Sequence, residues 1–143
     1  MSETLNTGTI HLIRHSDSYW RVTFDIPPLK IFGPANIPQL EEVVSCLETD
    51  DQVKVVVFDS AVEGFFITHW DFLAGFEDSN KFPAGQTGLQ PLPDMLARIS
   101  RLPVVSISLI RGRATGVGSE PLTSGDPSIP VELDLQHLCG RHR

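Results

Sequence analysis

Apolar and polar residues partly alternate in two stretches near the start of the chain. Residues 9–14 and 19–25 are rich in β-branched and aromatic side chains. The Asp17-Ser18 pair between them favours a turn, so the pattern predicts a β-hairpin or meander. The Pro27-Pro28 pair then ends the second strand, because proline has no N–H to donate to a ladder.

Two later stretches repeat their apolar residues at helical spacing. Between residues 37 and 48 these residues recur every three or four positions, which predicts a helix. Asn36 is a candidate N-cap, and Pro38 is suited to a first helical turn. Residues 92–102 have the same spacing and predict a second helix, which Pro103 ends.

Two short apolar runs, residues 53–59 and 104–110, do not alternate. Continuous apolar runs of this length are typical of strands covered on both faces, and they predict a sheet of parallel type. Between the runs, residues 74–91 gather glycines and prolines among polar residues, so we expect a mobile loop that could act as a lid. The order β-β-α-β-loop-α-β predicts an α/β fold.

The composition excludes several classes of protein. With 143 residues, 41% of them hydrophobic and 20% charged, the chain is long enough for one globular domain with a core. A net charge of -7 gives no electrostatic support for binding nucleic acid or an anionic membrane. No apolar run has the length of a membrane span, so we expect none.

The two cysteines, Cys46 and Cys139, are too few for a disulfide framework. The first residues are polar and acidic and lack the order of a signal peptide. We therefore expect an intracellular protein, either cytoplasmic or organellar. His137 and His142 flank Cys139 near the end of the chain, but three such ligands on a short terminus are usually coincidental, and we expect no metal site.

The second apolar run leads directly into the turn Gly112-Arg113-Ala114-Thr115-Gly116-Val117-Gly118-Ser119-Glu120. A glycine-rich turn lets the backbone approach a ligand and leaves N–H groups pointing at it. A Walker-type phosphate loop is excluded, because no lysine follows the glycines. The spacing also fits the nucleotide-binding turn of short-chain dehydrogenases, and a purely structural strand-to-helix turn is a further alternative.

Two segments together resemble the crotonase (enoyl-CoA hydratase/isomerase) superfamily. The turn from Gly112 to Glu120 is similar to the family's Gly-x-Ala-x-Gly-Gly-Gly-x-Glu. Val55–Phe58 and the later Phe66-Ile67-Thr68-His69-Trp70-Asp71 resemble the family's apolar strand and its Phe-x-x-Gly-x-Asp. The resemblance covers about residues 9–120. It implies an incomplete crotonase-like spiral of ββα repeats in residues 1–120, followed by an unrelated or irregular tail in residues 121–143.

The resemblance also implies a chemistry. Members of the family bind an acyl-CoA and polarise its thioester carbonyl with two backbone N–H groups, which correspond here to those of Trp70 and Val117. Glu120 aligns with the carboxylate that handles water or a substrate proton in the hydratases. Coenzyme A then enters as the thioester substrate, and no separate cofactor is implied.

Further residues, in the two segments and in the earlier Pro28-Leu29-Lys30 stretch, are implied in binding the substrate or its CoA part. They are Pro28, Leu29, Lys30, Phe66, Thr68, His69, Asp71, Gly116 and Gly118. Lys30 lies where the family contacts the nucleotide end of CoA, and it is suited to meet a phosphate. His69 and Val117 replace family glycines, and His69 is either a packed or hydrogen-bonding residue or a general base. Asp71 either caps backbone N–H groups or touches the substrate.

The resemblance ends after Glu120. Pro121 disfavours helical geometry at Glu120, whereas the family continues there with a helix, a second catalytic acid and the helices that build its trimer. Two hypotheses of different class follow. One is an acyl-CoA hydratase or isomerase; the other is a truncated, inactive chain that binds CoA weakly or associates with full-length relatives. A homo-oligomer is expected of the full-length family but has no support in this chain.

Overall fold

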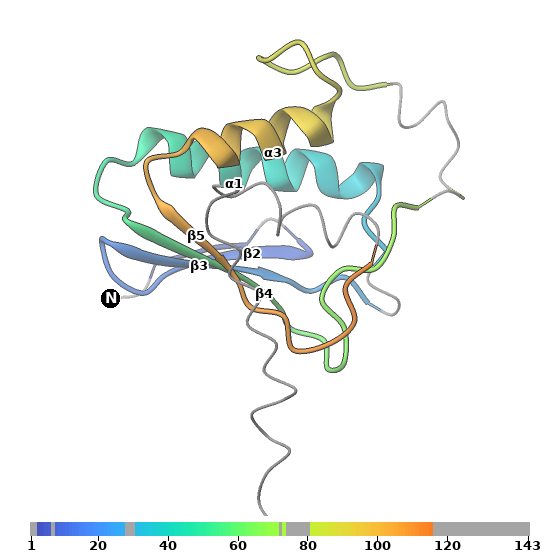
Figure 1. Cartoon of the computed structure of the whole chain (residues 1–143), viewed down its shortest axis with the longest axis horizontal. Coiled ribbons are helices and arrows are strands. Elements are labelled where there is room, and N and C mark those ends of the chain that lie inside the picture. Colours follow the sequence, from blue (N-terminus) through green and yellow to red (C-terminus); the bar gives the residue numbers. More distant parts are fainter. Residues whose placement is uncertain (1–2, 7, 28–30, 72, 74–80, 116–143) are drawn as a thin grey trace, which may run out of the picture.

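The computed structural model describes residues 3–6, 8–27, 31–71, 73 and 81–115. Three strands come first, and helices and strands alternate after them (Figure 1). The elements are β1 (Glu3–Asn6), β2 (Ile10–Arg14), β3 (Tyr19–Phe24), the 3-10 turn η1 (Pro34–Asn36), α1 (Ile37–Thr49), β4 (Val55–Ser60), α3 (Pro91–Arg101) and β5 (Val105–Ser108).

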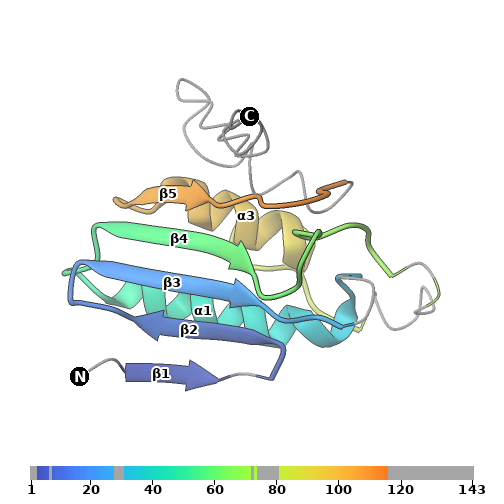
Figure 2. The same ribbon diagram turned by 90° about the horizontal axis from the view of Figure 1, so that it is seen from below.

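The strands form one five-stranded sheet in the order β1-β2-β3-β4-β5 (Figure 2). The pairs β1–β2 and β2–β3 are antiparallel, whereas β3–β4 and β4–β5 are parallel. The hairpin, both helices, the two later strands and the parallel pairing are confirmed. Strand β1 was not predicted, because among its residues only Leu5 is a large apolar one; its pairing with Leu12 of β2 is a tertiary contact.

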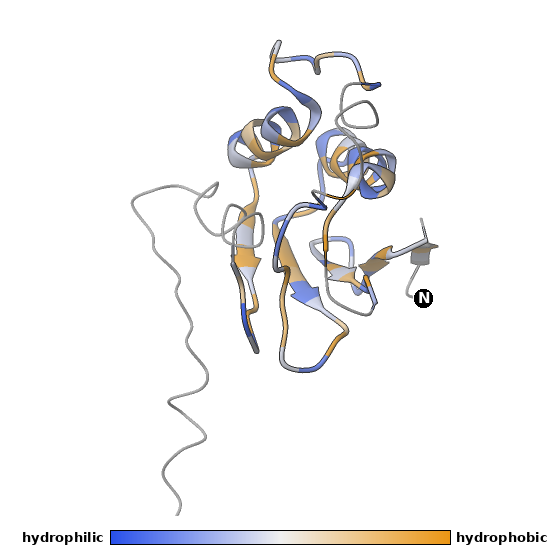
Figure 3. Cartoon of the chain, turned by 90° about the vertical axis from the view of Figure 1, so that its right-hand side faces the viewer, coloured by the Kyte–Doolittle hydropathy of each residue, from blue (hydrophilic) through white to orange (hydrophobic). Residues whose placement is uncertain are grey.

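Both α1 and α3 lie over one face of the sheet (Figures 1 and 3). The hydrophobic core fills the space between the two helices and the sheet. Alternate residues of β2, β3 and β4 point into it, together with the apolar side of α1 and residues of α3. Its most deeply buried members are Trp20, Phe32, Phe66, Ile10, Leu12, Leu47, Ile67, Met95, Val22, Val43 and Val44. The helical periodicity of the sequence therefore identified the correct face of α1.

Asn36 occupies the N-cap position of α1, but its side chain makes no cap hydrogen bond. Its Oδ1 instead accepts from the Gly33 N–H at 2.9 Å, and its Nδ2 donates to Thr9 Oγ1 at 2.8 Å. Pro38 lies in the first turn of α1, as predicted. The start of α1 is thus tied to the residue before β2 and to the segment that leads into the helix.

The prediction that residues 104–110 form a strand buried on both faces is wrong for β5. This strand lies at the edge of the described sheet, and Val105 is 59% exposed. Its register pairs Val105 with Val55 and Ile107 with Val57, so these side chains share the face away from the helices. A continuous apolar run does not specify what covers each face, and this information comes only from neighbouring segments.

A partly buried ion cluster joins α1 to α3, with Arg98 and Asp94 buried and Glu41 and Glu48 partly exposed. Arg98, which is 6% exposed, donates to Glu41 Oε1 at 2.7 Å and to Glu48 Oε2 at 2.7 Å. It also contacts Asp94 Oδ2 at 3.1 Å, one helical turn earlier on α3. Asp94 accepts from the N–H and hydroxyl of Thr87 at 2.7 and 2.8 Å.

The turn before α3 is joined to this cluster through the hydrogen bonds from Thr87 to Asp94. Gly85 N–H donates to the Leu89 carbonyl at 2.8 Å, and a Cβ on Gly85 would come within 2.1 Å of the Asp94 carboxyl carbon. The predicted loop of residues 74–91 is therefore a closed turn in its second part. Residues 74–80 lie outside the described residues, so the proposed lid stays a prediction.

Candidate functional site

Three segments that are far apart in the sequence lie side by side next to the sheet. They are residues 31–33, residues 64–71 and residues 111–115, and isolated parallel bridges join Phe32 to Trp70 and Phe65 to Arg113. The segment 64–71 is therefore in the middle. The two segments that resemble one family thus meet in space, and the chain that follows Pro28-Leu29-Lys30 joins them.

The first glycine of the glycine-rich turn is required by packing. A Cβ on Gly112 would lie 2.1 Å from the Gly64 carbonyl carbon and 2.5 Å from the Phe65 nitrogen, distances at which the backbone itself would have to move. Gly64 has φ +77°, a left-handed conformation that favours glycine. A glycine is therefore needed at position 112 so that the two backbone segments can cross. This requirement accounts for the glycine without invoking a bound ligand.

The N–H of Trp70 faces away from residues 31–33. Phe32 donates to the His69 carbonyl at 2.9 Å and accepts from the Asp71 N–H at 2.8 Å, so the Trp70 N–H lies on the other side of its strand. Residues 111–115 meet the central segment nearer its start: the Thr115 N–H donates to the Ile67 carbonyl at 3.2 Å, and the Phe66 N–H donates to the Arg113 carbonyl at 2.9 Å. Among the described residues no acceptor receives a hydrogen bond from the Trp70 N–H.

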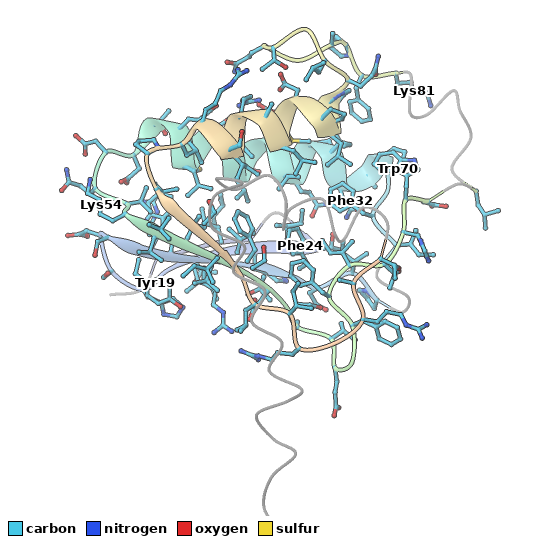
Figure 4. All side chains as sticks on the ribbon, in the orientation of Figure 1. Tyr19, Phe24, Phe32, Lys54, Trp70 and Lys81 are labelled. Atoms are coloured by element: carbon cyan, nitrogen blue, oxygen red, sulfur yellow. The ribbon has the colours of Figure 1, made fainter. Side chains whose placement is uncertain are left out.

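The aromatic side chains of this region pack against one another (Figure 4). The Phe66 ring is 1% exposed and meets Phe24 edge to face, with centroids 6.0 Å apart. The half-buried Trp70 ring lies 6.1 Å from that of Phe32. Phe66 therefore fixes the segment in the core. The Trp70 ring packs against Phe32, the residue whose backbone is hydrogen-bonded to both neighbours of Trp70.

His69, Thr68 and Thr115 meet at the solvent edge of the site. The Thr115 hydroxyl donates to the Thr68 carbonyl at 3.0 Å and lies 3.4 Å from His69 Nε2. His69 is exposed, while Thr68 is 7% exposed. Thr115 was not singled out in the sequence, where it occupies a variable position of the turn. Its β-branched, hydroxyl-bearing side chain among glycines was the available signal.

Asp71 caps the backbone. Its Oδ1 accepts from the Leu73 N–H at 2.9 Å, which is the first of the two roles expected for it. Its Cβ also packs on Gly33, where an added Cβ would come within 3.1 Å. Asp71 thereby fixes the end of the central segment against the chain that leads into α1.

Curated proteins of known name are similar to most of this chain. Ethylmalonyl-CoA decarboxylase of Xenopus laevis is 30% identical over 126 residues, which are 87% of this chain and 42% of that protein. The protein of the same name from Danio rerio is 31% identical and matches 83% of this chain and 40% of its own length. Enoyl-CoA hydratase domain-containing protein 2 of Mus musculus, named as mitochondrial, is 31% identical over 74% of this chain and 35% of its own length.

Solved structures agree with these relatives. A Streptomyces avermitilis protein assigned as an enoyl-CoA hydratase superposes with a TM-score of 0.72 and 25% identity, over 83% of this chain and 44% of that one. An enoyl-CoA hydratase from Geobacillus kaustophilus gives 0.74 with 18% identity, over 88% and 47%. No family model matches the sequence.

Over most of its length the chain resembles the N-terminal part of crotonase-superfamily proteins in sequence and in fold. It has the α/β crotonase fold over the described residues and spans 35–42% of the length of these curated relatives. The sequence resemblance is thereby confirmed, and the crotonase assignment displaces the short-chain dehydrogenase alternative for the glycine-rich turn.

Several of the residues that the crotonase resemblance implied lie outside the described part of the chain. They are Pro28, Leu29, Lys30, Gly116, Val117, Gly118 and Glu120. The proposed tail of residues 121–143 and the three potential metal ligands at its end lie outside it as well. The roles of the implied site residues, the irregular tail and the expected lack of a metal site at its end all stay predictions.

A cavity of about 250 Å³ opens at the carboxyl ends of β4 and β5. It is lined by Ser60, Ala61, Val62, Glu63, Gly64, Phe65, Leu109 and Arg111. None of the site residues expected from the crotonase resemblance lines it. No helix within the described ranges is long and apolar enough to span a membrane, and no metal-binding group of three or more His, Cys, Asp or Glu occurs among those residues.

Proposed function

We propose that this chain carries the carbonyl-binding part of an acyl-CoA enzyme, with the backbone N–H groups of Trp70 and Val117 as its two donors. One observation carries the proposal. Phe32 is hydrogen-bonded to the residues on both sides of Trp70, which leaves the Trp70 N–H facing away from residues 31–33 and available to a ligand. Thr115, two residues before Val117, is itself held against the central segment.

Two such donors accelerate any reaction that passes through a thioester enolate. Negative charge grows on the carbonyl oxygen as the enolate forms, so hydrogen bonds to this oxygen strengthen toward the transition state. A single donor of this kind typically contributes about 3 kcal/mol, or a factor of 10² to 10³ in rate. Because backbone N–H groups are rigidly placed, the site needs no reorganisation when the charge develops.

We assign the remaining steps to residues on either side of these donors. Glu120 transfers the proton at the acyl group, as a general acid or base, in a role that hydratases of the family give to the aligned carboxylate. Lys30 meets a phosphate of CoA. Residues 31–33 support this placement, because they run beside Trp70 directly after the Pro28-Leu29-Lys30 stretch.

Two reactions fit this arrangement, and both pass through an enolate. One is the hydration of an enoyl-CoA, which the name of the mouse relative suggests. The other is decarboxylation of a substituted malonyl-CoA, suggested by the names of the Xenopus and Danio relatives. In that reaction the carboxylate leaves as CO₂, its bonding electrons form the enolate, and a proton then adds at the α-carbon. Crotonyl-CoA and ethylmalonyl-CoA are the substrates that separate the two.

The test removes one donor while keeping the strand. Trp70→Pro removes the N–H at this position. The bonds to Phe32 are kept, because they are made by His69 and Asp71 and not by the Trp70 N–H. We expect the rate with the accepted substrate to fall by about 10² to 10³-fold. Trp70→Phe keeps the N–H, and its loss should be far smaller. Glu120→Gln should also reduce the rate strongly, since it removes the proton-transferring group.

Titration calorimetry with acetyl-CoA separates binding from turnover. Binding without turnover of either substrate would reduce the proposal to a CoA-binding role. The proposal fails if the parent chain neither binds acetyl-CoA nor turns over either thioester. It also fails if an active parent is matched by both Trp70→Pro and Glu120→Gln.

A further inference from the structure

The Thr115 side chain joins the two loops of the proposed site. Its hydroxyl oxygen lies 3.0 Å from the Thr68 carbonyl and 3.4 Å from His69 Nε2, although 46 residues separate it from His69. Its own N–H adds a third bond, to the Ile67 carbonyl at 3.2 Å. Three consecutive residues of the central segment are therefore bonded to one residue of the glycine-rich turn.

The number of protons at this junction limits which neutral form of the imidazole can bond to Thr115. A hydroxyl has one proton to donate, and the Thr68 carbonyl can only accept, so the Thr115 proton goes to Thr68. The contact with His69 is then a hydrogen bond only if Nε2 carries a proton and donates it to the Thr115 oxygen. In a neutral ring this hydrogen bond requires the Nε2–H tautomer, with Nδ1 unprotonated.

We propose that His69 and Thr115 form a latch that sets the spacing between the two carbonyl-binding N–H groups. This proposal rests on the proposed function and extends it to a pair of positioning residues. His69 immediately precedes Trp70, and Thr115 lies two residues before Val117. A hydrogen bond between them therefore acts next to both donors, which must reach the same oxygen at about 2.7–3.1 Å.

The latch gives a physical reason for a departure from the family pattern. The resemblance places a glycine at the position of His69, and a glycine has no side chain with which to reach Thr115. The histidine is exposed, so burial in the core does not account for it. The Thr115 contact is what its ring makes among the described residues.

The test compares four variants at the two positions. Thr115→Val keeps the shape of the side chain and removes the hydroxyl, and His69→Ala removes the donor. Each should lower kcat/KM by about 10 to 100-fold, mainly through kcat, because misplacing a donor by about an ångström is that costly. Thr115→Ser and His69→Gln retain a hydroxyl and an N–H donor and should restore most of the loss.

The double variant Thr115→Val/His69→Ala should be no worse than the more damaged single variant, because both remove the same bond. A merely structural role would instead appear in the thermal unfolding midpoint. We expect this midpoint to stay close to that of the parent, since the bond lies at the surface. Additive losses in the double variant would overturn the latch.

A second measurement does not depend on activity. Imidazole ¹⁵N shifts at alkaline pH report the fraction of each neutral tautomer. We expect His69 of the parent to be almost entirely the Nε2–H tautomer, and Thr115→Val to lower this fraction to that of a solvated histidine. His15, which is exposed and stacks on Tyr19 at 4.9 Å, is the internal reference and should not change.

An unchanged His69 tautomer in Thr115→Val overturns the latch, whatever the activity. A changed tautomer with unchanged kcat/KM in both single variants overturns its positioning role. A parent that neither binds nor turns over an acyl-CoA removes the proposed function and the positioning role together, even where the tautomer shifts as expected. The failure of the latch and that of the proposed function are therefore distinguishable.

Discussion

The interface between α1 and α3 and the crossing of the backbones at Gly64 and Gly112 are stabilised by different interactions. At the helix interface, the side chain of Arg98 reaches three carboxylates, two of them on the other helix. At the crossing, Gly112 lies against Gly64 with no room for a Cβ, and backbone hydrogen bonds join Arg113 to Gly64 and Phe66.

The difference follows from what each region must do. Long side chains can adjust to keep two helices together, so the interface tolerates small shifts of the backbone. At the crossing the contact is between backbone atoms, and no side-chain adjustment can correct an error there. Substitutions at the helix interface should therefore act mainly through the loss of charge. Substitutions at the crossing should act mainly through steric clashes.

The largest effect is expected from Arg98→Met at the helix interface. Loss of the guanidinium leaves Glu41, Glu48 and the 1% exposed Asp94 without their counter-charge. Breaking a buried ion pair in this way destabilises by about 3–5 kcal/mol. Urea unfolding measures the difference, with Arg101→Met on the exposed side of α3 as the control. A loss below about 1 kcal/mol for Arg98→Met would show that the cluster contributes little.

A smaller effect is expected at the crossing, from Gly112→Ala. The added Cβ meets backbone atoms, which cannot rotate away, so we expect a loss of about 3 kcal/mol together with reduced activity. Gly64→Ala is the matched comparison, because its Cβ would meet no atom within 4 Å and only the positive φ opposes it. That substitution should cost about 1 kcal/mol. Equal losses for the two variants would contradict a steric origin.

Acid should weaken the helix interface and leave the crossing unaffected. The hydrogen bond from Arg98 lowers the pKa of Glu48 below its ordinary 4.5. Burial raises the pKa of Asp94, but hydrogen bonds from Thr87 and Arg98 outweigh it, and the pKa falls below 3.8. Carboxyls with lowered pKa values stabilise the fold above their unfolded pKa values, and this contribution is lost as the pH falls through the folded ones.

Unfolding free energies measured in a series of buffers from neutral to strongly acidic test this prediction. The parent should lose stability with falling pH more steeply than Arg98→Met, in which the lowering by Arg98 is absent. Gly112→Ala retains the cluster and should follow the slope of the parent. Parallel curves for the parent and Arg98→Met would mean that the cluster does not determine acid stability.

The periodicity of the sequence was sufficient for most of the elements. Helical spacing placed α1 and α3 to within a residue or two, and the β-branched runs placed β2 to β5. Strand β1 was missed because Leu5 gains its partner, Leu12, only in the sheet. The exposure of Val105 was also missed, because an apolar run in the sequence does not show whether one or both faces of the strand are covered.

For the candidate site, the sequence determined which segments belong together, because two motifs in the right order resembled one family. The tertiary structure alone determined the roles within them. It shows that Gly112 is required by Gly64, that Phe32 bonds to the residues on both sides of Trp70, and that Thr115 meets His69. The physical reason is range. Propensity and periodicity act between near neighbours in the chain, whereas these contacts join residues that are far apart in sequence and meet only when the chain folds.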